Sequence, residues 1–311
     1  MEKITNLLDK GVSRRGFIGG VGATAAAGLL AGCSTSTSST PSTGPTDADV
    51  LNFALNLEYL EAEFYLRAAT GVGLSATDAG AGAGTVTGGS AVPGLSSTFQ
   101  QYVNEIAYDE AQHVKFLRSA LGSAAVSRPN IDFTNAFTTL AVAAGIISAG
   151  STFNPFADFD SFLVGAFVFE DVGVTAYHGA AGLLQSKSTL GAAAGIMATE
   201  AYHAGIVRTI LTGRAINAAA TSTAYPYIGY ANKVATLRGT LGGGNETMLV
   251  VPSSLTTPSS IVAADATSAV AFSRSTDQVL HIVYGTPGGA GVKSGVFFPN
   301  GLNGNISVTT S

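Results

Sequence analysis

Two segments far apart in the chain carry the same pair of side chains, and both side chains are of types that bind metal ions. Glu110 and His113 lie in DEAQHVKFLRSAL, and Glu200 and His203 lie in TEAYHAGIVRTIL. Residues three apart share one face of a helix, so the carboxylate and the imidazole of each pair can reach one ion. One such pair is weak evidence, but two pairs within apolar segments indicate a metal centre built by helices.

Two further glutamates lie in apolar segments with helical periodicity. Glu58 is in LNFALNLEYLEAEFYLRAA, and Glu170 is in DSFLVGAFVFEDVGVTAYHGAAGLL. At about 100° per residue, each falls inside the apolar stripe of its helix. A carboxylate in that position must be protonated, paired or bound to a metal. Glu61 lies beside Glu58, and it is either an extra ligand or a group that contacts one.

The order of these side chains indicates a weak internal duplication. The chain reads Glu, Glu-x-x-His, Glu, Glu-x-x-His, and a tyrosine follows the first and third glutamates at the same spacing, as Tyr65 and Tyr177. A duplication of this kind predicts two helix pairs related by an approximate two-fold axis, with the carboxylates meeting near it. The two tyrosines share the carboxylate face. They could hydrogen-bond to ligands or relay an electron, or they are ordinary core tyrosines.

The predicted cofactor is a pair of divalent metal ions, either iron or manganese. Four carboxylates balance the charge of two such ions, and oxygen-rich sites with two imidazoles accept both metals. The alternative is a metal-free core whose polar side chains are protonated or hydrogen-bonded. The six predicted ligands are Glu58, Glu110, His113, Glu170, Glu200 and His203.

The connections predict an all-α four-helix bundle over residues 47–213. A long Gly- and Ala-rich loop joins the first two helices, and a longer crossover, 122–160, joins the second and third. One long crossover of this kind is typical of a known class of four-helix bundles. A helix is expected within the crossover, at AFTTLAVAAGIISAG. Residues 214–311 are predicted to form an extension packed on the bundle, with irregular structure, a short helix from Thr276 and a strand near the end.

The first residues read as an export signal. SRRGFIGG, with Arg14 and Arg15, resembles a twin-arginine signal, and LLAGC resembles a lipoprotein processing site ending in Cys33, the only cysteine. These features predict a signal over 1–32, a Ser/Thr/Pro-rich tether over 33–46, and a lipid on Cys33 that anchors the protein to a membrane. The expected location is the bacterial cell envelope, as a periplasm-facing lipoprotein. The alternatives are a transmembrane anchor and an ordinary signal with an unmodified cysteine.

The overall charge argues against a nucleic-acid partner. The chain has 311 residues with Lys+Arg 15 and Asp+Glu 20, a formal charge of -5, so no basic patch is expected. With 46% hydrophobic residues, the chain can bury one large core.

Four segments resemble the desiccation-related proteins, a bacterial and plant branch of the ferritin-like superfamily: LNFALNLEYLEAEFYLRAA, YDEAQHVKFLR, FEDVGVTAYHGAAGLL and FFPNGLNG. The resemblance implies a ferritin-like bundle, with the six side chains named above as its ligands. Three functions then compete. The first is a di-metal oxidoreductase acting on peroxide or dioxygen, either manganese-catalase-like or an iron oxidase. The second is a non-catalytic envelope scaffold that acts during stress and drying, and the third is an iron-storage cage. A homo-oligomer is compatible with each.

Overall fold

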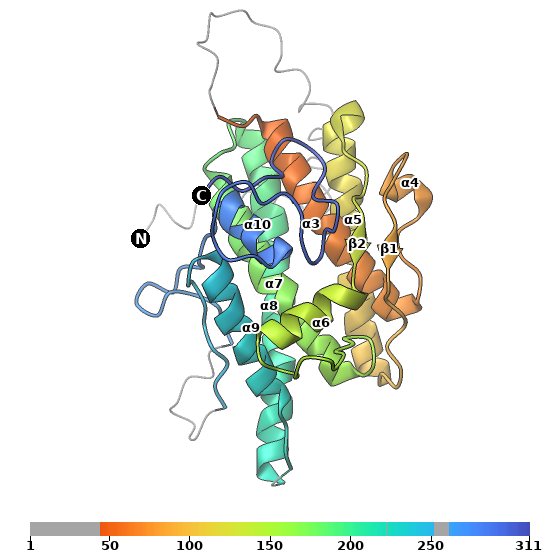
Figure 1. Cartoon of the computed structure of the whole chain (residues 1–311), viewed down its shortest axis with the longest axis vertical. Helices are drawn as coiled ribbons and strands as arrows, with labels where there is room; N and C mark the ends of the chain where they lie inside the picture. The colour runs from red at the N-terminus through yellow and green to blue at the C-terminus, as the bar shows by residue number, and fades with distance from the viewer. Residues whose placement is uncertain (1–43, 222, 252–260) are drawn as a thin grey trace, which may run out of the picture. The chain divides into compact units, whose positions relative to one another are not determined.

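The computed structural model describes residues 44–221, 223–251 and 261–311 (Figure 1). The predicted export signal, with Arg14 and Arg15, and the predicted lipid acceptor Cys33 lie outside these residues. Within the described part, no helix combines the length and the apolar character that crossing a membrane requires.

Four long helices form a bundle, which confirms the predicted fold class (Figure 1). Helix α3 packs along α5, and α7 packs along α8, while α3 and α7 also contact each other. The two helix pairs expected from the internal duplication are therefore present. The helices span Asp47–Thr70 (α3), Ser97–Leu121 (α5), Phe159–Ala181 (α7) and Lys187–Ala220 (α8). Helix α8 thus continues beyond residue 213, the last residue of the predicted bundle segment.

Each of these helices begins at a side chain that caps it. Thr46 and Asp49 form a capping box at the start of α3. Ser96, Asp158 and Ser186 accept hydrogen bonds from the first turns of α5, α7 and α8. Such caps satisfy backbone N–H groups that have no partner inside the helix. They fix where each helix starts, and hence the height at which its glutamate lies.

The two long connections contain short elements that pair with each other. The α3–α5 connection holds α4 (Ala76–Ala79) and strand β1 (Val86–Thr87). The crossover holds the 3-10 helix η1 (Gly122–Ala124), strand β2 (Ile131–Asp132) and the expected helix, α6 (Thr134–Ala143). Strands β1 and β2 run parallel. The connection predicted as a plain loop is therefore tied to the crossover.

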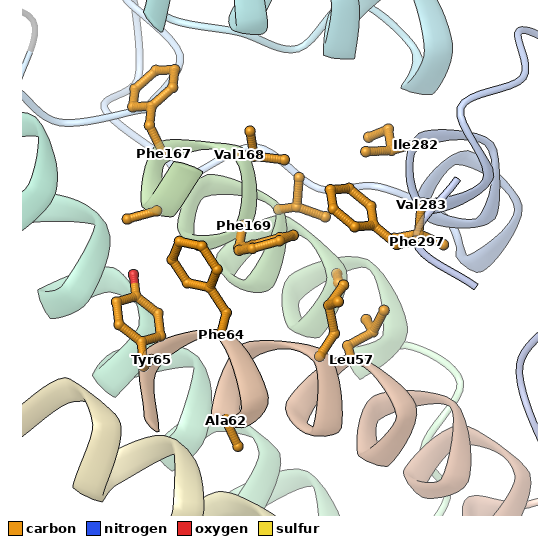
Figure 2. Packing of buried hydrophobic residues seen from close by; sticks show 14 of the residues in the cluster. Leu57, Ala62, Phe64, Tyr65, Phe167, Val168, Phe169, Ile282, Val283 and Phe297 are labelled. Carbon is orange, nitrogen blue, oxygen red and sulfur yellow. The ribbon is translucent and has the colours of Figure 1, made fainter. Parts of the chain in front are cut away.

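The residues after α8 pack on the bundle through α9 (Tyr227–Gly242) and α10 (Thr276–Tyr284). Helix α9 contacts α7 and α10. Figure 2 shows Ile282 and Val283 of α10 and Phe297 close to Phe169 of α7. The segment after residue 293, expected as turn and strand, forms turns and bends. Among the described residues of 214–311, one isolated antiparallel β-bridge joins Ala264 and Ala271.

Buried ion pairs join this extension to α7. Arg238 donates to Asp171 Oδ2 at 2.8 Å and to Glu246 Oε2 at 2.7 Å. Arg274 donates to Glu246 Oε1 at 2.7 Å, and Arg208 of α8 also donates to Asp171. Charges are kept inside a protein only when they are paired, because an unpaired buried charge is strongly destabilising. The extension is therefore an integral part of the folded unit.

Candidate metal centre

The bundle brings the six predicted ligands together at its centre. They form two groups, and within each group the possible ligand atoms lie within 4.8 Å of one another. Glu110 and Glu200 belong to both groups, so these two carboxylates lie between two positions where a cation fits. The first group is Glu58, Glu110, His113 and Glu200, and the second is Glu110, Glu170, Glu200 and His203.

The possible metal-ligand atoms of this cluster are buried, and several of them have no hydrogen-bond partner. The four glutamates are 0–1% exposed. Both oxygens of Glu110 and of Glu200 lack a hydrogen-bond partner of acceptable geometry, as do Glu170 Oε2 and His203 Nδ1. Buried polar atoms are normally hydrogen-bonded. Carboxylate oxygens and imidazole nitrogens are ligands that iron and manganese accept, so the side chains present fit a metal pair.

Both histidines point the same nitrogen into the cluster. His113 Nδ1 lies 3.1 Å from Glu58 Oε2, and 3.4 Å from an oxygen of Glu110 and of Glu200. His203 Nδ1 lies 2.9 Å from Glu110 Oε1 and 3.7 Å from Glu170 Oε2. Nδ1 is therefore the nitrogen that each imidazole offers to a cation.

Burial and crowding shift the pKa values of these groups in different directions. Burial raises the pKa of Glu58 to about 7 and that of Glu170 to about 8, although His113 and His203 respectively oppose the shift. Burial also acts to raise the pKa of Glu110, but the adjacent imidazoles of His113 and His203 outweigh it and lower this pKa to about 2. Burial, and then the neighbouring Glu110, raise the pKa of Glu200 well above its usual value. Without a cation, protons must neutralise part of the cluster.

The two tyrosines bind the outer carboxylates, which are those of Glu58 and Glu170, the glutamates that belong to one ligand group each. Each tyrosine binds the glutamate of the other helix pair. Tyr65 of α3 donates a hydrogen bond to Glu170 Oε1 of α7, and Tyr177 of α7 donates one to Glu58 Oε1 of α3. Each bond engages one oxygen and leaves Oε2 facing the histidine of the same group. The expected hydrogen bonds to predicted ligands are thus present, whereas a catalytic role for these tyrosines stays a prediction.

Sequence reasoning missed Asp109, which contacts a histidine from the neighbouring helix pair. Asp109 Oδ2 lies 3.2 Å from His203 Nε2, the nitrogen that faces away from the cluster. Asp109 directly precedes Glu110, so its position on α5 was available from the sequence. The sequence could not show that Asp109 contacts His203, because this contact depends on how α5 and α8 are rotated against each other.

Gly173 is a second missed position. A Cβ atom built on Gly173 would lie 2.3 Å from Glu200 Oε2, so a side chain there would displace this carboxylate. Gly173 follows Glu170 by three residues, as Glu61 follows Glu58. Glu61 is 5% exposed, and burial and the negative charge of Glu200 raise its pKa well above the usual value. The two halves of the duplication therefore differ in the turn after the outer glutamate.

Comparison with known proteins agrees with the helical fold. Residues 46–213 match the family model described as "Ferritin-like domain". The chain is 29% identical over 268 residues to ferritin-like catalase Nec2 of Nesocodon mauritianus, which covers 84% of this chain and 85% of the relative. It is 32% identical over 203 residues to desiccation-related protein PCC13-62 of Craterostigma plantagineum, which covers 63% of each chain. The resemblance seen in the sequence is confirmed, and the chain belongs to the family of proteins with a ferritin-like domain.

Proposed function

We propose that this protein is an exported, lipid-anchored oxidoreductase that uses a pair of manganese or iron ions to disproportionate hydrogen peroxide. The observation that carries the proposal is the pair of four-ligand groups that share Glu110 and Glu200. The first group would hold one ion through Glu58 and His113 and the second would hold another through Glu170 and His203, with Glu110 and Glu200 available to both, and such a pair would supply two-electron chemistry. The similarity to a relative named as a ferritin-like catalase favours peroxide over dioxygen as the substrate.

The reaction balances without another reductant or oxidant. One peroxide molecule gives up two electrons and two protons and becomes dioxygen. A second takes up two electrons and two protons and becomes two molecules of water. When bound, the metal pair would supply the reservoir that stores the two electrons between these half-reactions. The protein's own task is to store the protons and to hold the ligands while the charge of the site changes.

The residues around the cluster are suited to that task. Burial raises the pKa of Glu61 well above its usual value in the metal-free cluster, and this carboxyl group is our candidate for holding a proton beside the site. Tyr65 and Tyr177 donate to Glu170 and Glu58 and so fix the outer carboxylates. Leu60 and Phe169, both buried, belong to the apolar core that keeps bulk water from the cluster. A dry, rigid site favours two-electron chemistry over the release of reactive intermediates.

Export and anchoring rest on the sequence pattern around Arg14, Arg15 and Cys33. A twin-arginine route would move the protein already folded, with manganese or iron loaded before it meets copper and zinc outside the cytoplasm. This order matters because copper and zinc bind most nitrogen and oxygen sites more tightly. Mass spectrometry of the mature protein should find a lipid on Cys33, and Cys33→Ser should release the protein from the membrane. A full-length protein with an unmodified Cys33 would refute this part of the proposal.

The activity is tested by oxygen evolution from hydrogen peroxide. The purified mature protein should release dioxygen, and Glu110→Gln should abolish the release because Glu110 lies in both ligand groups. Glu105→Gln is the matched control, since Glu105 is an exposed glutamate on the same helix. A folded, metal-loaded protein that releases no dioxygen would refute catalase activity. A stable metal-free protein would favour the non-catalytic scaffold, the alternative that fits the similarity to a desiccation-related protein.

A further inference from the structure

We infer that the two metal positions are unequal: the Glu170–His203 position binds its ion more tightly and fills first, and the Glu58–His113 position is the more labile one. The inference rests on the metal pair of the proposed function. It adds a positioning residue, Asp109, and an order of loading.

The carboxylate of Asp109 contacts His203 on the side of the ring that faces away from the cluster. Its Nδ1 faces the cluster, and its Nε2 lies 3.2 Å from Asp109 Oδ2. With a cation on Nδ1, the ring proton resides on Nε2 and is donated to Asp109. A carboxylate in this position fixes the tautomer and the orientation of the ring and makes the imidazole a stronger ligand. The imidazole of His203 is only 3% exposed, whereas the side chain of Asp109 is half-buried.

His113 has no such support. Its Nδ1 faces Glu58, and its Nε2 has no hydrogen-bond partner among the described residues. His113 is 9% exposed, the largest value among the six predicted ligands. The outer edge of His113 therefore lacks a counterpart of the carboxylate that holds His203. An imidazole that lacks such a carboxylate loses more conformational freedom when it binds a metal ion.

The difference in support between the two histidines lies at one position of the duplication. Asp109 precedes Glu110 on α5, and Thr199 precedes Glu200 at the equivalent place on α8. Thr199 has no charge, and its hydroxyl group donates to the carbonyl of Gly195 in its own helix at 3.4 Å. The carboxylate that holds His203 thus has no counterpart for His113. Glu61 and Gly173 also differ between the halves, but Glu61 makes no hydrogen bond to either imidazole among the described residues.

Stepwise binding of Mn²⁺ to the metal-free mature protein tests the inference without measuring activity. The free ion gives an electron paramagnetic resonance signal that disappears on binding, so a titration yields both dissociation constants. We expect two steps that differ by about tenfold or more, the range by which such outer carboxylates change metal affinity. His113→Ala should leave one tight site, and His203→Ala should leave one weak site.

Three variants separate positioning from general damage. Asp109→Asn should weaken the tight step by about tenfold and spare the other. Glu105→Gln, which removes an exposed charge from the same helix, should change neither step. Thr199→Asp installs the missing carboxylate and should tighten the weak step, a gain that misfolding cannot produce.

The outcomes distinguish this inference from the proposed function. Two equal steps, or an effect of Asp109→Asn no larger than that of Glu105→Gln, would overturn the inequality and leave the metal pair in place. A folded protein that binds no Mn²⁺ and no Fe²⁺ would overturn the inference and the proposed function together.

Discussion

The hydroxyl group of Tyr65 donates a hydrogen bond to Glu170, although 105 residues separate them in the chain. In the reciprocal contact, the hydroxyl group of Tyr177 donates a hydrogen bond to Glu58. Each helix pair therefore supplies the group that orients the other pair's outer carboxylate. The duplication seen in the sequence has become a reciprocal contact at the centre of the bundle.

Replacement of Tyr65 by phenylalanine should destabilise the protein and weaken its metal site. The variant leaves Glu170 Oε1 buried without its donor, and an unsatisfied buried polar group costs about 1–3 kcal/mol. Chemical denaturation and metal content of Tyr65→Phe should both show the loss. Tyr202→Phe is the control, because Tyr202 is 75% exposed. Equal stability and metal content in both variants would contradict an orienting role for Tyr65.

Gly173→Ala should remove metal binding while the fold persists. The new Cβ would lie 2.3 Å from Glu200 Oε2 and push this carboxylate out of place. Alanine stabilises a helix interior by about 1 kcal/mol relative to glycine, which opposes the cost of displacing the carboxylate. The free energy of unfolding should therefore change little. Gly195→Ala is matched to it, because nothing lies within 4 Å of the Cβ built there. Full metal occupancy in Gly173→Ala would show that Glu200 has another position from which to bind.

Loss of the charge on Glu246 should lower the free energy of unfolding far more than loss of a surface charge does. Arg238 and Arg274 both donate to Glu246, and all three side chains are at most 6% exposed. Breaking a buried ion pair by removing one partner costs about 3–5 kcal/mol. Urea denaturation of Glu246→Gln should show a loss of this size, against almost none for Glu105→Gln. A loss below about 1 kcal/mol, the value typical of an exposed pair, would mean that water reaches these arginines.

Metal binding should stabilise the protein more as the pH rises. In the metal-free protein, burial raises the pKa of Glu58 to about 7 and that of Glu170 to about 8. Because both values are raised above those of the unfolded chain, both carboxyls stabilise the fold at low pH. They lose that contribution as the pH rises through about 7 and 8.

A bound cation replaces these protons, so the increase in Tm caused by manganese should be small near about pH 5.5 and should grow toward about pH 8. Thermal melts with and without the metal measure it. An increase that is constant over this range would contradict the buried, proton-filled cluster.

The sequence predicted the centre of the molecule well because burial and periodicity are linked there. Glu58 and Glu170 stand out as carboxylates inside apolar stripes, and only a few roles suit such a group. Spacing of three residues then joined Glu110 to His113 and Glu200 to His203 on one face each. The bundle followed from four such helices and the length of their connections.

Contacts between elements were beyond sequence reasoning. Asp109 looks like an ordinary half-exposed helix residue until α8 is placed beside it. Arg238 and Arg274 are of a residue type that usually lies on the surface, and only the folded extension shows that they are buried. The pairing of β1 with β2 joins two segments whose residues carry no strong strand pattern. In each case the missing information was the rotation or the neighbour of an element, which local periodicity does not encode.

The measurement that tests the central claim most directly is the metal content of the mature protein, purified from its native envelope without added metal. The arrangement of Glu58, Glu110, His113, Glu170, Glu200 and His203 predicts about two equivalents of manganese or iron per chain. Glu110→Gln should lose both ions, and Glu105→Gln should keep them. A stable, folded protein with no manganese or iron would contradict the di-metal account and leave the bundle as a scaffold.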